Sequence, residues 1–112
     1  MSIKVDMNCI ALTGNAVSSP DYSSITTKDG KEVPKATFRI GHNPRRDFSM
    51  FLQITCFGQL AVNSATFVTK GKKIGIEGRL EISGYTDKEG KNRYYTEIIA
   101  NKLVFLDKIE RS

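Results

Sequence analysis

The sequence of 112 residues contains no tryptophan, a single histidine and two cysteines. Cys9 and Cys56 have neither CxxC nor histidine-rich spacing around them, so we expect buried, reduced thiols and neither a disulfide nor a metal site. With His42 as the only histidine, no serine or cysteine has a base partner that is evident in the sequence. These absences argue against an enzyme and predict no cofactor.

Long apolar runs are also lacking. No segment approaches the length of a membrane span or of a secretory signal, and charged residues are mixed into the first positions of the chain. We therefore predict a cytoplasmic protein with no membrane partner. The alternative is a mature mitochondrial protein whose targeting segment has already been removed.

Positive charge is in excess, because 17 Lys and Arg residues against 12 Asp and Glu residues give a formal net charge of +5 and a pI near 9.3. This balance favours polyanionic partners but does not demand them. The distribution is more informative than the total, and the positive residues cluster at three places: Lys28, Lys31 and Lys35; Arg45 and Arg46; Lys70, Lys72 and Lys73.

Alternation of apolar and polar residues predicts a mainly β fold. We expect strands over residues 7–16, 36–41, 48–57, 73–82 and 93–106, the last with one break, and a helix over residues 59–70 that Gly71 ends. Asp-Gly and Glu-Gly turns at 28–31 and 87–92 and a polar loop at 42–47 separate the strands. The length suits one domain. Five strands with one helix between the third and fourth predict a five-stranded OB-fold barrel, a single domain over residues 1–112 with its core at about 7–106.

The stretch from Phe51 to Phe57 carries the clearest functional pattern. Strict alternation puts Phe51 and Phe57 on the face opposite Leu52, Ile54 and Cys56, so the two rings face away from the core. Gln53 and Thr55 lie between them. Such a mixed surface suits a flat, partly polar ligand such as an unpaired nucleobase, although packing under a loop or a second subunit would also explain the two rings.

In the order and spacing of its motifs, the chain resembles the bacterial-type single-stranded-DNA-binding proteins over roughly residues 7–106. The motifs are Leu12-Thr13-Gly14-Asn15 followed by Pro20; Phe57-Gly58-Gln59-Leu60-Ala61; Lys70-Gly71; Ile76-Glu77-Gly78-Arg79-Leu80; and Tyr85-Thr86-Asp87 through Gly90 to Arg93-Tyr94 and Thr96-Glu97. The resemblance implies sequence-tolerant binding and protection of single-stranded DNA during replication, recombination and repair. It also implies a homotetramer in which dimers form largely through the first strand.

The same resemblance suggests which aromatic residues bind. Phe57 matches a family aromatic that stacks on bases, while Phe51 and Tyr85 stand where relatives commonly carry stacking tryptophans. Phe67 and Lys70 also correspond to family binding positions, but an aromatic residue at this helix position can equally belong to the core. Tyr94 and Tyr95 must point to opposite faces of their strand, so at most one of them readily shares the surface of Tyr85.

The cations expected to contact phosphates lie on outward strand positions or on loops. They are Lys35, Arg39, Arg45, Arg46, Lys73, Arg79, Lys88 and Lys91. About half of them are expected to serve only as solvated surface, since exposed Lys and Arg commonly confer solubility.

The chain also departs from the pattern of these proteins. It lacks tryptophan, Gln59 replaces a frequent lysine, and Arg45 and Arg46 fall roughly where relatives often place another aromatic residue. The sequence ends at Ser112 without the flexible linker and acidic tip through which bacterial members recruit replication and repair proteins. Either the sequence is truncated or the protein is a tailless relative. Two alternatives also stay open: a tailless primosomal replication protein that acts as a dimeric adaptor, and an RNA-binding OB module of the cold-shock type.

Overall fold

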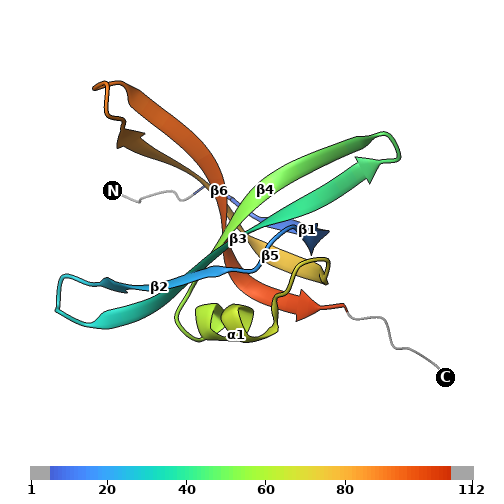
Figure 1. The fold of residues 1–112 in the computed structure, drawn as a ribbon, viewed down its shortest axis with the longest axis horizontal. Coiled ribbons are helices and arrows are strands. Elements are labelled where there is room, and N and C mark those ends of the chain that lie inside the picture. The colour runs from blue at the N-terminus through green and yellow to red at the C-terminus, as the bar shows by residue number, and fades with distance from the viewer. Residues whose placement is uncertain (1–5, 107–112) are drawn as a thin grey trace.

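The computed structural model describes residues 6–106. Seven elements follow one another along the chain (Figure 1): β1 (Ile10–Ala16), β2 (Asp21–Thr26), β3 (Glu32–Arg45), β4 (Phe48–Phe57), α1 (Gln59–Phe67), β5 (Lys73–Thr86) and β6 (Asn92–Phe105). The helix joins the two strands that were predicted as third and fourth. The predicted all-β class with one helix at this point is confirmed.

The strands form one sheet that closes on itself. The order is β1-β5-β6-β4-β3-β2, and an additional pairing of β1 with β3 joins Asn15 to Gly41 and Ala16 to Ile40. The ring therefore contains β1, β5, β6, β4 and β3, which are the five strands of the expected OB fold, while β2 pairs only with β3.

The sixth strand, β2, was not predicted. Its residues were interpreted as a turn-rich segment, but they pair with β3 from Asp21 opposite Thr37 to Thr26 opposite Glu32. Every residue of β2 is exposed, so the segment has no core face to create an alternating pattern. The Asp-Gly turn that follows was predicted, and Gly30 adopts a φ of 82° there.

Two strands extend further than their apolar patterns indicated. Strand β3 continues to Arg45 and pairs with β4, so the prediction of a loop over residues 42–47 was wrong for most of that range. A register shift between His42 and Arg45 accommodates Pro44, which cannot donate a ladder hydrogen bond. Strand β5 likewise runs past Ile82 to Thr86, which places Tyr85 within the strand. In both cases the strand leaves the core, and the alternation weakens where neither face is buried.

The ends of β1 and α1 also differ from the predictions. Strand β1 begins at Ile10 rather than at Met7, because the side-chain amide of Asn8 replaces backbone pairing: it donates to the Leu80 carbonyl oxygen at 2.8 Å and accepts from the Leu80 amide at 2.9 Å. The helix ends at Phe67, since Val68 is already extended. Gly71, with a φ of 90°, lies in the following turn and does not cap the helix.

The core contains large side chains from β3, β4, β5 and β6, among them Phe38, Ile54, Ile74 and Ile98, and α1 contributes Ala61. A bulge at the junction of Glu77 and Gly78 leaves Asn101 of β6 unpaired. Strand β6 nevertheless runs without interruption from Asn92 to Phe105, so the prediction of a break in the last strand was wrong. At the bulge, glycine is a steric requirement, because a Cβ at Gly78 would lie 2.2 Å from the Ile99 carbonyl oxygen.

The two cysteines differ in their surroundings. Cys56 is buried as predicted, and its burial raises the pKa of the thiol to about 12, although a hydrogen bond with Ser64 acts in the opposite direction. Cys9 is exposed, so its predicted burial was wrong. It lies just before β1 begins at Ile10. Both thiols are free.

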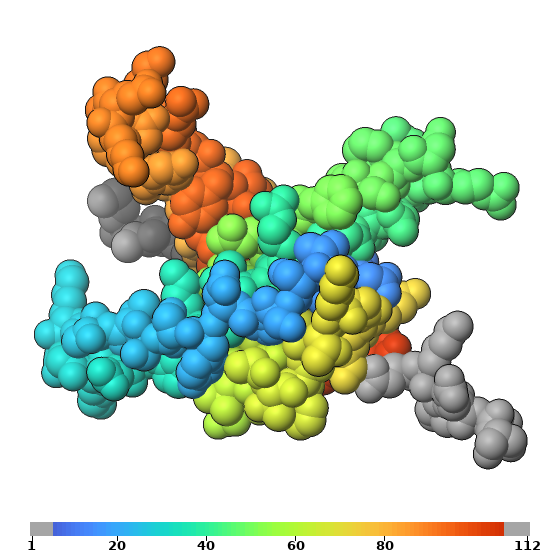
Figure 2. Space-filling model, in the orientation of Figure 1, coloured from blue at the N-terminus to red at the C-terminus, as the bar shows by residue number. Residues whose placement is uncertain are grey.

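Three hairpins project from the body as arms, formed by β2 and β3, by β3 and β4, and by β5 and β6 (Figure 1). Figure 2 shows them as separate projections, with the helix on the side of the body away from the β3–β4 and β5–β6 arms.

Candidate nucleic-acid interface

One outward face of the sheet carries the predicted stacking residues. Residues that pair across neighbouring strands point to the same side of a sheet. On β4, Phe51 pairs with Gly41, Gln53 with Arg39, and Phe57 with Lys35 of β3. We call the side of β3, β4, β5 and β6 that bears these residues the front face.

Both phenylalanine rings have the orientation that the alternation predicted. Phe51 is 58% exposed and Phe57 is 37% exposed, whereas Ile54 and Cys56 on the other side of β4 are fully buried. Phe57 lies six positions along the strand from Phe51, which is roughly 20 Å at about 3.3 Å per residue. Gly41 provides a bare backbone surface under Phe51, because a Cβ placed there would lie 3.4 Å from the ring.

The front face continues across β6 and β5. Gln53 of β4 pairs with Glu97 of β6, and Glu97 pairs with Glu81 of β5. Two residues further toward the tip of the hairpin, Ser83 pairs with Tyr95, and two residues beyond that pair, Tyr85 pairs with Arg93.

Tyr85 and Tyr95 therefore share the front face, and their ring centroids are 6.2 Å apart. This resolves the ambiguity between the two adjacent tyrosines, because Tyr94 occupies the opposite side of the arm. Tyr85 is 56% exposed, so its ring is accessible as the sequence interpretation required.

A buried polar network lies between the two groups of rings. Glu97 accepts a hydrogen bond from the Thr55 hydroxyl at 2.5 Å and another from the Ser83 hydroxyl at 2.8 Å. Thr55 and Glu97 are both buried. Because the three residues belong to β4, β5 and β6, this network holds together the strands that carry Phe51, Phe57 and Tyr85.

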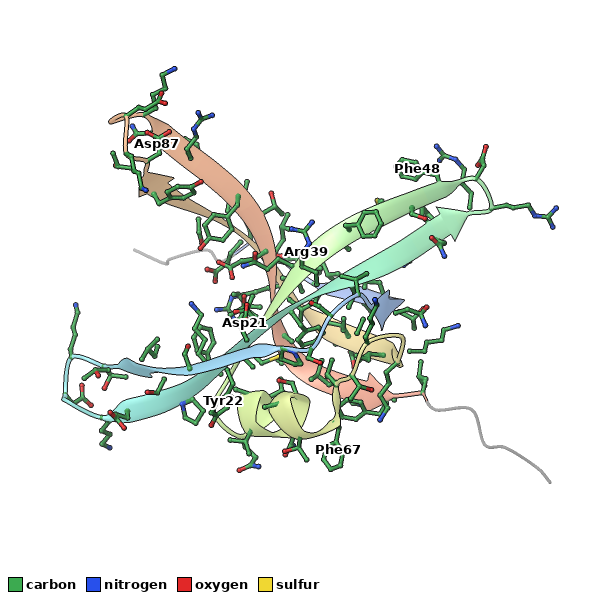
Figure 3. All side chains as sticks on the ribbon, viewed as in Figure 1. Asp21, Tyr22, Arg39, Phe48, Phe67 and Asp87 are labelled. Carbon is green, nitrogen blue, oxygen red and sulfur yellow. The ribbon has the colours of Figure 1, made fainter. Side chains whose placement is uncertain are left out.

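Lys35 and Arg39 are the cations adjacent to the rings of β4. Lys35 is half-buried opposite Phe57, while Arg39 is exposed and lies between the β3–β4 and β5–β6 arms in Figure 3. Neither forms an ion pair within residues 6–106. Both therefore present positive charge on the front face, and counterion release on contact with phosphates would favour binding there.

The tip of the β3–β4 arm carries two more of the predicted cations. The Arg45 guanidinium lies 4.6 Å from the centre of the Phe48 ring, and it also forms an exposed ion pair with Asp47 at 3.5 Å. Arg46 is exposed beside them. Phe48 is 43% exposed, although alternation assigns it to the core side of β4. Sequence reasoning missed it because the arm extends beyond the core at this point.

Arg79 on β5 is less available for a phosphate contact, since it donates a hydrogen bond to the Glu81 carboxylate at 2.8 Å. At the tip of the β5–β6 arm, Lys88 and Lys91 are exposed. The Asp87 carboxylate orders this tip by accepting hydrogen bonds from the backbone amides of residues 89 and 91 and from Arg93. The Arg93 hydrogen bond is the main reason that the pKa of Asp87 falls below its usual range.

Three of the predicted residues are not gathered with the others. Phe67, at the end of α1, packs against Phe105 with ring centroids 5.7 Å apart, and Figure 3 shows it beyond the helix, far from Arg39 and Phe48. Lys70 is exposed in the turn after the same helix. Lys73 begins β5 opposite Asn15 and lines a polar hollow of about 110 Å³ together with Gly41.

Within the described range, 6–106, no three His, Cys, Asp or Glu side chains come together in a way that could hold a metal ion. No helix in that part of the chain combines the length and apolar character needed to cross a membrane.

Comparison with known proteins identifies the family of this chain. Residues 7–106 match the model of the single-strand binding protein family. The chain is 32% identical to a protein of Onion yellows phytoplasma named single-stranded DNA-binding protein, over 90% of this chain and 95% of that one. It is 30% identical to single-stranded DNA-binding protein 1 of Clostridium acetobutylicum, over 90% and 94%, and 37% identical to protein 2 of the same organism, over 90% and 77%. The chain therefore belongs to the single-strand binding protein family.

Proposed function

We propose that this protein binds and covers single-stranded DNA during replication, recombination and repair, with little preference for base sequence. One observation supports the proposal above all: Phe51, Phe57 and Tyr85 are exposed on a single face, and Lys35 and Arg39, which form no ion pair with any residue of 6–106, lie on that same face. The names of the similar proteins support it. In this proposal, binding involves no covalent step and the protein acts at the nucleoid.

The rings would stack on bases, and the cations would contact phosphates. Stacking contributes about 1–3 kcal/mol per base, so three rings supply roughly 3–9 kcal/mol, whereas micromolar affinity requires about 8 kcal/mol. Stacking alone is therefore barely sufficient. Phosphate contacts from Lys35 and Arg39, and from Arg46, Lys88 and Lys91 on the two arms, provide the remainder in this proposal.

Selectivity for single strands follows from the same chemistry. Every base has a face on which an aromatic ring can stack, so base sequence matters little, but pairing in a duplex hides those faces. Phe67, Lys70 and Lys73 lie outside the front face. They would be reached only by a strand that continues around the body.

We further propose that the protein is a homotetramer whose dimers form through β1. Beside β1 is a shallow apolar hollow of about 390 Å³, lined by Ala11, Leu12, Gly75, Val104 and Leu106. Val104 and Leu106 are about two-fifths exposed there, so a second subunit could bury them. Sedimentation equilibrium measures the mass directly, and a stable dimer would instead favour the primosomal adaptor.

The decisive experiment is a titration with oligo-dT, with a duplex of equal length and with the matching RNA, each at several salt concentrations. We expect a strong preference for single-stranded DNA and a large loss of affinity in Phe51→Ala/Phe57→Ala. Tyr22→Ala is the matched control, because Tyr22 is an equally exposed ring that lies beside α1 in Figure 3. Equal affinity for the duplex would reject the stacking mechanism, and preference for RNA would reject DNA as the ligand.

A further inference from the structure

The β5–β6 arm has a second exposed surface, which the proposed interface does not use. On the side opposite Tyr85, β5 presents Ile82 and Gly84, and β6 presents Tyr94 and Thr96. We call this side the back face of the arm. Nearer the body the same side of the sheet belongs to the core, where Ile98 is buried, but on the arm Tyr94 is 71% exposed and Ile82 is 69% exposed.

A hollow of about 220 Å³ lies on this back face, lined by Gly84, Thr86, Asn92 and Tyr94 together with Tyr85. The Tyr94 ring lies against the backbone of Gly84, since a Cβ at that position would come within 3.0 Å of the ring. The glycine therefore leaves room for the ring beside the strand. The Thr86 hydroxyl donates a long hydrogen bond of 3.4 Å to the Asn92 amide oxygen.

These features match the requirements of a nucleobase. A flat ring supplies a stacking surface, and the Asn92 amide beside it offers donors and an acceptor to the edge of a base. Lys88 and Lys91 are exposed in the turn at the tip of the same arm, which a phosphate backbone passing from the front face to the back face would have to cross. Their positive charge complements that path.

We propose that the hollow bounded by Tyr94, Gly84 and Asn92 is a second base-binding site, so that one DNA strand passes from Tyr85 around the tip of the arm to Tyr94. This inference rests on the proposed function, because it requires single-stranded DNA on the front face. It predicts that Tyr94 contributes only when the oligonucleotide is long enough to reach both faces.

The absence of tryptophan makes this path measurable. Tyr94→Trp and Tyr85→Trp each introduce a sole tryptophan, whose fluorescence is quenched when a base stacks on it. We would titrate both variants with oligo-dT of about 6 and about 30 nucleotides, lengths that bracket the usual site of about 4–16 nucleotides per fold. Tyr22→Trp reports on a ring remote from the arm.

We expect both oligonucleotides to quench the tryptophan at position 85, only the longer one to quench the tryptophan at position 94, and neither to quench the one at position 22. Tyr94→Ala should lose about 5- to 150-fold in affinity for the longer oligonucleotide, the equivalent of one stacked base, while Tyr94→Phe should retain it.

The outcomes separate the two proposals. If position 85 is quenched and position 94 responds to no length of DNA, the second site is rejected and the front-face interface stands. If the emission at position 94 depends on protein concentration in the absence of DNA, a second copy of the chain covers the back face and the inference is likewise rejected. If no reporter responds to oligo-dT, the proposed function fails as well.

Discussion

Replacing Glu97 by alanine tests whether the buried network holds the two halves of the front face together. In Glu97→Ala the Thr55 hydroxyl loses its acceptor while only 1% of Thr55 is exposed, which costs about 1–3 kcal/mol. The half-buried Ser83 hydroxyl can rotate and donate its hydrogen bond to water instead, so losing the Ser83–Glu97 hydrogen bond costs about 1 kcal/mol. Removing a buried carboxylate recovers part of its own desolvation penalty. We therefore expect a net destabilisation of about 2 kcal/mol.

Urea denaturation measures this value. With a slope of about 2 kcal/mol/M, the midpoint should fall by roughly 1 M. A double-mutant cycle with Thr55→Val isolates the hydrogen bond, because valine has nearly the same shape as threonine and leaves no hydroxyl without a partner. The double mutant should be less destabilised than the sum of the two single mutants.

Two results would refute the reasoning. One is a change in the free energy of unfolding of less than about 0.5 kcal/mol for Glu97→Ala, which is the scale of an ordinary surface substitution. The other is strict additivity in the cycle with Thr55→Val, since additivity would mean that the two side chains do not interact. Glu97→Gln serves as the control, because its amide oxygen can still accept from Thr55.

Three further predictions concern single residues. Arg39→Ala should reduce the log-log salt slope of oligo-dT binding by about 0.7, the value for one phosphate contact to a single strand. Arg79→Ala should change the slope less, because Arg79 is already paired with an acid. Equal slopes in titrations of wild type and Arg39→Ala would show that Arg39 does not contact phosphate. Gly78→Ala places a Cβ 2.2 Å from a backbone oxygen of β6 and should lower stability by about 3 kcal/mol or more in thermal denaturation, and a wild-type melting temperature would contradict this. In native protein at pH 8 a thiol reagent should modify Cys9 rapidly and leave Cys56 intact, because burial holds the pKa of Cys56 at about 12; rapid reaction of both cysteines would show that Cys56 is not buried.

Much of the front face could be predicted because strand alternation is local. In the stretch from Phe51 to Phe57, each inward residue meets the core and each outward residue does not, so the sequence pattern and the burial agree. On the arms, the sequence pattern and the burial do not agree in this way. Beyond the core both sides of a hairpin are solvated, which is why β2, the end of β3 and the exposure of Phe48 were missed.

By itself, the sequence determined the five strands of the ring in their order along the chain, the helix that follows the Phe48–Phe57 strand and the outward direction of Phe51 and Phe57, because these depend on the periodicity of neighbouring residues. Only the tertiary structure decided that Tyr95 rather than Tyr94 accompanies Tyr85, and that Glu97 lies buried between the two groups of rings. Both depend on the pairing register of strands that are distant in the sequence, and a shift of one residue in that register would turn every side chain to the other face.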